Sequence, residues 1–190
     1  TRQDHPIRVV YLNSLGSRLG SRYEITLEID DLKEAIRLVH DTVKSTPLDH
    51  PDRAMFMSSK ANLLGYQYER TGALDDLQQA IQADHDVIKA TSPHHSRRPL
   101  RLNNLSVRLA SRYERTGQMN DLQEAIRLGR EAVQATPNDH PKRAMYMSNL
   151  GSKLRSQYER LGILSDLQEA IHLTRCAVEA TPLEDLDRAR

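Results

Sequence analysis

Apolar residues along this chain fall at helical spacing, and their pattern repeats every 45 residues. One clear stripe consists of Leu122, Ala125, Ile126, Ala132 and Val133, which would share a face of an α-helix. The same register carries Asp-Leu at 31/32, 76/77, 121/122 and 166/167, Ala-Ile at 35/36, 80/81, 125/126 and 170/171, and Tyr-Glu at 23/24, 68/69, 113/114 and 158/159. A fixed period in this range is typical of helical solenoids.

Each repeat predicts two helices. The second helix is expected to begin at an N-cap residue, whose side-chain oxygen accepts a free N–H group, and to end before a threonine that a proline follows in three repeats. The N-caps would be Asp30, Asp75, Asn120 and Ser165, and the threonines are Thr46, Thr91, Thr136 and Thr181. The first helix would open at His-Pro, with the proline in its first turn, and close at a left-handed glycine. These pairs stand at 5/6, 50/51 and 140/141, and the glycines are Gly72, Gly117 and Gly162.

Small residues at one register of the first helix predict a close approach of its partner helix; they are Gly16, Ala61, Ser106 and Gly151. Departures from the repeat predict local differences. Leu27 replaces the C-cap glycine, so the first turn should differ, and Lys60 replaces a core leucine, so the second repeat should pack less well unless Leu63 compensates. The proline at 93 is shifted by one residue and Pro99 is unusual, which predicts a late start and a bend in the fifth helix.

The predicted fold class is all-α: a right-handed α-solenoid of four helix-turn-helix repeats, with about eight helices and partial repeats at its ends. We expect one solenoid segment over residues 1–190, with repeats at 5–49, 50–94, 95–139 and 140–184 and the start of a fifth at 185–190. Because the repeats begin and end part-way through the period, we expect the chain to be a segment of a longer array. Its uncapped ends should expose apolar surface, which predicts self-association.

Composition narrows the function classes. The 27 basic and 26 acidic residues give a net charge of +1, so nothing pulls the chain as a whole towards nucleic acid or an anionic membrane. No apolar run approaches the roughly 20 residues that span a bilayer. The one cysteine, Cys176, allows no intrachain disulfide, which favours a cytoplasmic location.

The marks Leu15-Gly16, Leu19, Ala35 and Pro47 resemble those of the tetratricopeptide repeat, whose standard length is about 34 residues. HEAT-type repeats share the period range but fit these marks less well. The stretch from Leu102 to Pro141 resembles the long arrays of fungal multidomain proteins, including NOD-like receptors with a NACHT domain and proteins with a CHAT domain. The resemblance implies a scaffold that binds a protein or peptide ligand on a concave face of first helices, and it implies no cofactor and no enzyme.

Groove positions carried over from the family vary between repeats, while the core marks do not. A ligand-facing surface and a merely solvated face would both show this variation. The residues are Asn13, Ser17, Ser58, Asn62, Tyr66, Asn103, Val107, Ser148, Ser152 and Arg155. Gly20, Ser21, Gly65, Ala110, Ser111 and Ser156 occupy the remaining positions of this set.

The sequence gives weaker indications of metal binding, nucleophilic catalysis or RNA binding. Four of the eight histidines recur at 45-residue steps, too far apart to share a metal ion, and they are expected to be structural residues at the starts of helices. For Cys176 we expect no histidine within helical reach, hence no paired base for a nucleophile. The arginines of the third repeat, such as Arg108 and Arg112, would suit an RNA-binding array. Aromatics for base stacking are scarce, however, and a salt-bridged face is favoured.

Overall fold

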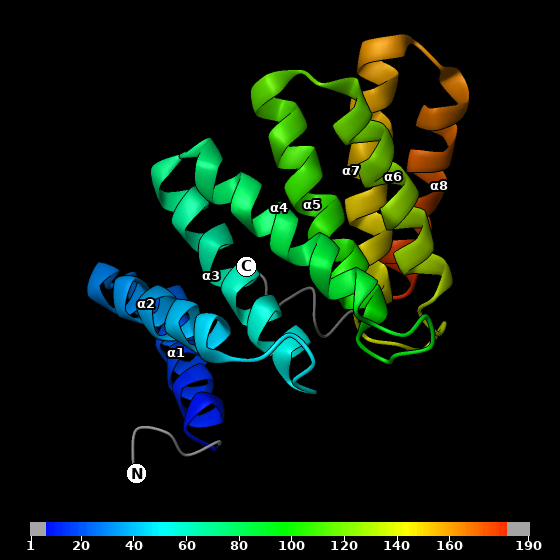
Figure 1. Cartoon of the computed structure of the whole chain (residues 1–190). Coiled ribbons are helices and arrows are strands. Elements are labelled where there is room, and N and C mark those ends of the chain that lie inside the picture. Colours follow the sequence, from blue (N-terminus) through cyan, green and yellow to red (C-terminus); the bar gives the residue numbers. More distant parts are fainter. Residues whose placement is uncertain (1–6, 182–190) are drawn as a thin grey trace. The chain divides into compact units, whose positions relative to one another are not determined.

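The computed structural model describes residues 7–181, and these form eight α-helices in four consecutive pairs (Figure 1). The helices are α1 (Ile7–Thr26), α2 (Ile29–Ser45), α3 (Arg53–Thr71), α4 (Leu74–Lys89), α5 (Arg98–Thr116), α6 (Met119–Gln134), α7 (Arg143–Leu161) and α8 (Leu164–Glu179). The described chain contains no strand. The predicted all-α class and helix-pair repeat are thereby confirmed. The His-Pro pair at 5/6 and residues 182–190, including the predicted start of a fifth repeat, lie outside the described residues.

The chain divides into an N-terminal unit, Thr1–Ser92, and a C-terminal unit, Pro93–Arg190. In the first unit α1 packs on α2, α3 packs on α4, and α3 also contacts α2 and α1. The second unit repeats this arrangement with α5 to α8, where α7 contacts both α6 and α5. In each unit the later of the two first helices, α3 or α7, therefore packs on the helix pair that precedes it.

Each unit has its own apolar core, built from the stripes that the sequence predicts. In the N-terminal unit Leu32, Ala35 and Val39 of α2 pack with Tyr23 and Leu63. In the C-terminal unit α6 contributes Leu122, Ile126 and Val133, and these pack with residues of α7 and α8. Burial of such aliphatic area is the main favourable term in stability.

The small residues of the first helices do allow the predicted close approach. A Cβ atom on Gly16 would lie 2.6 Å from Val39 Cγ2, and one on Gly151 would lie 3.3 Å from the carbonyl oxygen of Ala170. In the third repeat the Ser106 hydroxyl donates to the carbonyl oxygen of Ala125 at 2.7 Å. Larger side chains at this register would push the two helices of a pair apart.

The turn between paired helices has the predicted left-handed residue in all four repeats. Gly72, Gly117 and Gly162 have φ between 68° and 71°. The expectation that Leu27 changes the first turn is wrong, because Leu27 adopts φ 57° and its N–H donates to Tyr23 O at 2.8 Å, just as Gly72 N–H donates to Tyr68 O. The first repeat therefore has the same turn conformation as the others, with a leucine in a left-handed conformation that is unfavourable for residues other than glycine.

The predicted N-caps of the second helices are wrong. The N-cap positions lie two residues earlier than predicted. They are held by Glu28, Ala73, Gln118 and Ile163, and none of these makes a side-chain cap bond. Instead the hydroxyls of Thr26, Thr71 and Thr116 accept the N–H groups of residues 28, 73 and 118. A local turn motif outside the helix therefore takes the place of the N-cap.

The aspartate of each second helix is buried and bonds to the first helix of its own pair. The four bonds are Arg22–Asp31, Gln67–Asp76, Arg112–Asp121 and Gln157–Asp166, with lengths of 2.5 to 2.9 Å. The hydrogen bond from Arg22 lowers the pKa of the Asp31 carboxyl. These contacts tie the two helices together and add to the favourable dipole interaction that their position predicts.

The His-Pro pairs at 50/51 and 140/141 precede the first helices instead of opening them. Helices α3, α5 and α7 begin at Arg53, Arg98 and Arg143, which are 45 residues apart, so the predicted late start of the fifth helix is wrong. The histidines are structural, since Nδ1 of His50 and of His140 each accepts an N–H two residues later at 3.1 Å.

An arginine at the start of the first helix links consecutive pairs. Arg53 donates to the carbonyl oxygens of Val43 and Thr46, at the end of α2. Arg143 donates to the equivalent oxygens of Val133 and Thr136, at the end of α6. The carbonyls at a helix C-terminus lack partners within the helix and carry partial negative charge, so this arginine caps the preceding repeat.

Candidate functional site

The face of the C-terminal unit that α5 and α7 share brings several predicted groove residues together. Asn149 Nδ2 donates to Asn103 Oδ1 at 3.1 Å and joins the two helices. Asn103 itself is buried, so it contributes little accessible surface. Val107, Ser152 and Arg155 all border one cavity of about 200 Å³ between these helices. We call this cavity the α5–α7 pocket.

The α5–α7 pocket is polar and holds a basic side chain that sequence reasoning missed. Its charged and hydroxyl-bearing residues are Ser111, Tyr113, Glu114, Ser152, Lys153, Arg155 and Ser156. The Lys153 side chain is buried, and its Nζ donates to the carbonyl oxygen of Asn149 at 2.9 Å. Burial lowers the pKa of Lys153 to about 8, against the opposing effect of nearby Glu114. Desolvation of this kind disfavours the charged amine.

The register of Lys153 explains its burial. In the N-terminal unit the equivalent residue is Leu63, whose Cδ2 would lie 2.6 Å from a Cβ atom on Gly20. Leu63 thus fills the space between α1 and α3, and Lys153 reaches into the corresponding space between α5 and α7. A comparison of these two positions in the sequence, which share one phase of the 45-residue period, would have flagged an amine at a core position.

The groove residues predicted for the N-terminal unit lie in different surroundings. Asn13 is buried, and its Oδ1 has no hydrogen-bond partner. Ser17 Oγ lies 3.3 Å from Ser59 Oγ of α3, and the Tyr66 ring lies against Tyr23 with centroids 6.2 Å apart. Ser58 and Asn62 are half-buried. Ser148, the remaining member of the predicted set, is exposed and lines a different cavity with Ser152 and Arg155.

Metal binding and cysteine chemistry were the other candidates from the sequence. No group of three or more His, Cys, Asp or Glu within residues 7–181 is arranged to hold a metal ion. The expectation that Cys176 has no histidine in reach is wrong: His172 lies four residues earlier on α8, with Nε2 3.7 Å from Sγ. Residues four apart share a helix face, and this pair was overlooked.

Arginines of the third repeat are engaged with carboxylates. Arg98 pairs with Glu131 at 3.1 Å, and Arg112 pairs with buried Asp121 at 2.6 Å. Arg108 also has an interaction within the protein. Because RNA binding draws on cations that are available to phosphates, these contacts favour the salt-bridged face over an RNA-binding surface. None of the described helices is long and apolar enough to cross a bilayer.

Comparison with known proteins supports the repeat type. A tetratricopeptide repeat profile matches residues 100–142, which run from α5 through α6 to the residue before α7. The fold is similar to the crystal structure of MamA, at 17% identity over 97% of this chain and 83% of that chain with a TM-score of 0.60. A comparison with curated protein sequences gives no match.

Two further solved structures share the architecture. One is a Podosopora anserina putative kinesin light chain with nearly identical TPR-like repeats, at 22% identity, 93% coverage of this chain, 76% of that chain and a TM-score of 0.64. The other is BtubC (BKLC) from P. vanneervenii, at 11% identity, 95% and 76% coverage and a TM-score of 0.58. At these identities the likeness concerns the fold alone, which is an array of TPR-like helix pairs. Such repeats generally serve as scaffolds for protein interaction.

Proposed function

We propose that this chain is a protein-interaction scaffold whose α5–α7 pocket binds an acidic peptide segment of a partner protein. The observation that carries the proposal is the buried amine of Lys153 beside Arg155 and several serine hydroxyls. A carboxylate that enters this pocket would meet hydrogen-bond donors whose strength is increased by partial exclusion of water. Arg155 is available for exchange, since its contact with Glu159 is exposed and 3.6 Å long.

The wider context of the proposal is a larger cytoplasmic receptor-like protein of the fungal NOD-like type. The support is the resemblance of the Leu102 to Pro141 stretch to the long arrays of such proteins, together with the profile match over the same region. In that setting the array recognises a ligand, and an effector domain outside this segment responds. The segment itself is proposed to be non-catalytic.

The experiment is a selection from a displayed random-peptide library, followed by affinity measurement on the enriched peptides. We expect peptides rich in Asp and Glu, with affinity falling at least about tenfold in Lys153→Leu, because the lost charge-assisted bond is worth about 1.5 kcal/mol or more. Ser152→Glu should also weaken binding, because it narrows the pocket and adds a negative charge that repels a carboxylate. Lys33→Leu, which removes an exposed cation from α2, is the control and should bind like the parent.

Two outcomes would contradict the proposal. One is a selection in which peptides rich in Asp and Glu are not enriched. The other is a set of enriched peptides that bind Lys153→Leu and Ser152→Glu as tightly as the parent, which would place the binding surface elsewhere.

A further inference from the structure

A cavity of about 590 Å³ is lined by the two loops that precede α5 and α7 and by the first turns of these helices. We call it the loop cavity. Its lining runs from Pro93 to Leu100 in one wall and from Ala135 to Tyr146 in the other, so both walls belong to consecutive repeats of the C-terminal unit. Repeats of a solenoid contact their neighbours in series, and a repeat after α8 would therefore pack on the side of α7 that faces away from this cavity.

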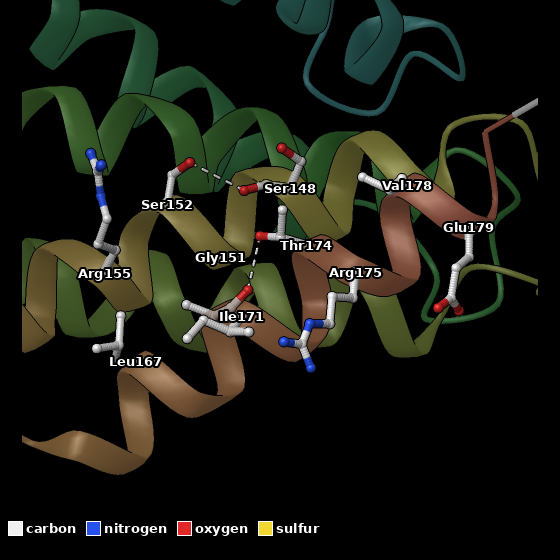
Figure 2. Close-up of a pocket in the computed structure, with 11 residues that line it drawn as sticks. Ser148, Gly151, Ser152, Arg155, Leu167, Ile171, Thr174, Arg175, Val178 and Glu179 are labelled. Atoms are coloured by element: carbon white, nitrogen blue, oxygen red, sulfur yellow. Dashed lines mark hydrogen bonds between the residues drawn. The ribbon is translucent and has the colours of Figure 1, made fainter. Parts of the chain in front are cut away.

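The lining of the loop cavity is basic and contains no acidic residue. Arg97 and Lys142 are exposed cations of its two walls, and three histidines accompany them. The acidic residue of these loops, Asp139, is not part of the lining. The other cavities of this unit differ, because Glu114 borders the α5–α7 pocket and Glu179 borders the cavity on α7 and α8 (Figure 2). The loop cavity is thus suited to an anion.

The positive charge of the first wall arises from departures from the repeat. In the second repeat the corresponding loop carries Asp49 and Asp52, whereas the third repeat has His94 and Arg97 at these positions. Both acids are thus replaced by basic residues. Helices α3 and α5 begin at the same phase of the period behind these two loops, so the start of the helix does not require the change of charge.

Two of the histidines are held as hydrogen-bond donors by their own loops. Nδ1 of His95 accepts the N–H of Arg97 at 3.0 Å, and Nδ1 of His140 accepts the N–H of Lys142 at 3.1 Å. A ring nitrogen that accepts carries no hydrogen, so Nε2 is the donor of each ring. Because both rings line the cavity, the loops fix two imidazole donors there before a ligand binds, which lowers the cost of binding.

This set of donors fits a phosphate group better than a carboxylate. A phosphorylated serine or threonine carries a charge of about −1.5 to −2 and three acceptor oxygens, which matches two cations and two imidazole N–H groups. The planar guanidinium of Arg97 can donate to two of these oxygens at once. A carboxylate has one charge and two oxygens, and it would leave part of the set without an acceptor.

The remaining lining favours a peptide as the carrier of the phosphate. Pro93, Leu100 and Pro137 are apolar and would contact the residues that flank a phosphorylated side chain. Tyr146 is only 2% exposed, so its ring offers no face on which a nucleic-acid base could stack.

We propose that the loop cavity binds a phosphorylated serine or threonine of a partner protein. The phosphate lies between Arg97 of one wall and Lys142 of the other, and its oxygens accept hydrogen bonds from the two imidazoles. None of the residues involved borders the α5–α7 pocket. The inference therefore holds or fails separately from the binding of acidic peptides proposed for that pocket.

The test measures binding of the full chain to three pools of synthetic peptides whose fixed central residue is phosphoserine, glutamate or serine and whose flanking positions are random. We expect the chain to retain peptides from the phosphoserine pool. The affinity of the retained sequences, measured by fluorescence anisotropy, should fall at least about tenfold when glutamate replaces phosphoserine, because charge-assisted hydrogen bonds are lost. The serine versions should not bind detectably.

Variants of the two walls place the phosphate in the loop cavity. Arg97→Asp and Lys142→Asp each introduce the residue that the second repeat has at this register, Asp52, after which α3 begins normally. Each should lower the affinity for the phosphoserine peptides at least about tenfold, and the double variant should not bind them. The control is Arg115→Asp, which makes the same charge change at an exposed residue near the other end of α5 and should bind like the parent. Circular dichroism confirms that each variant is folded.

Three outcomes would overturn the inference. In the first, the chain retains no phosphoserine peptides, or retains the three pools equally. In the second, the double variant binds the phosphoserine peptides as tightly as the parent while Lys153→Leu loses them, which would place the phosphate in the α5–α7 pocket. In the third, a random single-stranded oligonucleotide binds more tightly than the phosphoserine peptides and displaces them, which would assign the basic lining to nucleic acid.

Discussion

Leu27 holds a backbone conformation that glycine holds in the other three repeats. Its φ of 57° is in the left-handed region, and its side chain is exposed. A residue with a Cβ atom pays about 1 kcal/mol or more in this region. We therefore expect Leu27→Gly to stabilise the N-terminal unit by about 1 kcal/mol in urea unfolding. Gly72→Ala, at the same place in the next repeat, should destabilise by a similar amount. If the free energy of unfolding is unchanged in Leu27→Gly, contacts of the leucine side chain compensate for the strain.

Asn13 shows a different residue-level defect, an acceptor without a donor. Asn103, its equivalent in the C-terminal unit, accepts from Asn149, but the residue at the position of Asn149 in the N-terminal unit is Ser59. Ser59→Asn should supply the missing donor and stabilise the unit by about 1 kcal/mol. The gain should vanish in an Asn13→Ala background, which a double-mutant cycle would measure. A gain that persists there would assign it to another contact.

At the scale of the element, the packing of α5 against α7 is predicted to depend on pH through Lys153. Its pKa falls from 10.5 to about 8 in the folded protein, so the unfolded chain binds the proton more tightly. Stability should therefore rise as the pH increases from about 8 towards 10.5, where the unfolded amine also loses its proton.

Lys153→Leu, which copies Leu63 of the N-terminal unit, removes that titration. We expect it to be more stable than the parent by up to about 3 kcal/mol at pH 7, at 1.36 kcal/mol per pKa unit, with the difference shrinking above pH 8. Chemical denaturation of both proteins from pH 6.5 to 10 measures the difference, and other titrating groups cancel because both proteins share them. A constant difference would show that Lys153 is not desolvated.

These elements also show how far sequence could predict the structure. The 45-residue period fixed the number, type and phase of the helices, because apolar spacing and left-handed glycines act locally. The predicted N-cap at Asp30 was wrong because the Thr26 hydroxyl forms a turn just before the helix. The role of Asp31 could not be predicted locally because it depends on Arg22 of another helix. Lys153 is buried through contacts that include helix α5, and the only signal of this in the sequence is that it shares its register with the core residue Leu63.

For the molecule as a whole, the two units are built as separate cores. The cluster around Leu122, Leu150 and Leu154 lies entirely within the C-terminal unit, and the cluster around Leu32 and Leu63 lies within the N-terminal one. In repeat proteins stability is approximately a sum of repeat and nearest-neighbour terms. Each unit contains two helix pairs and the interface between them, which is the smallest arrangement that includes both kinds of term.

We therefore expect the fragment 93–190 to fold without the rest of the chain. Far-ultraviolet circular dichroism should show a helical protein, and urea should unfold it in one cooperative transition, because α7 covers α6 and α5 inside this fragment. Leu154→Asp would place a charge in the fully buried centre of the core and should abolish the transition, which separates a packed core from isolated helices. A fragment that is unfolded or melts without cooperativity would show that its core needs residues 1–92 to form.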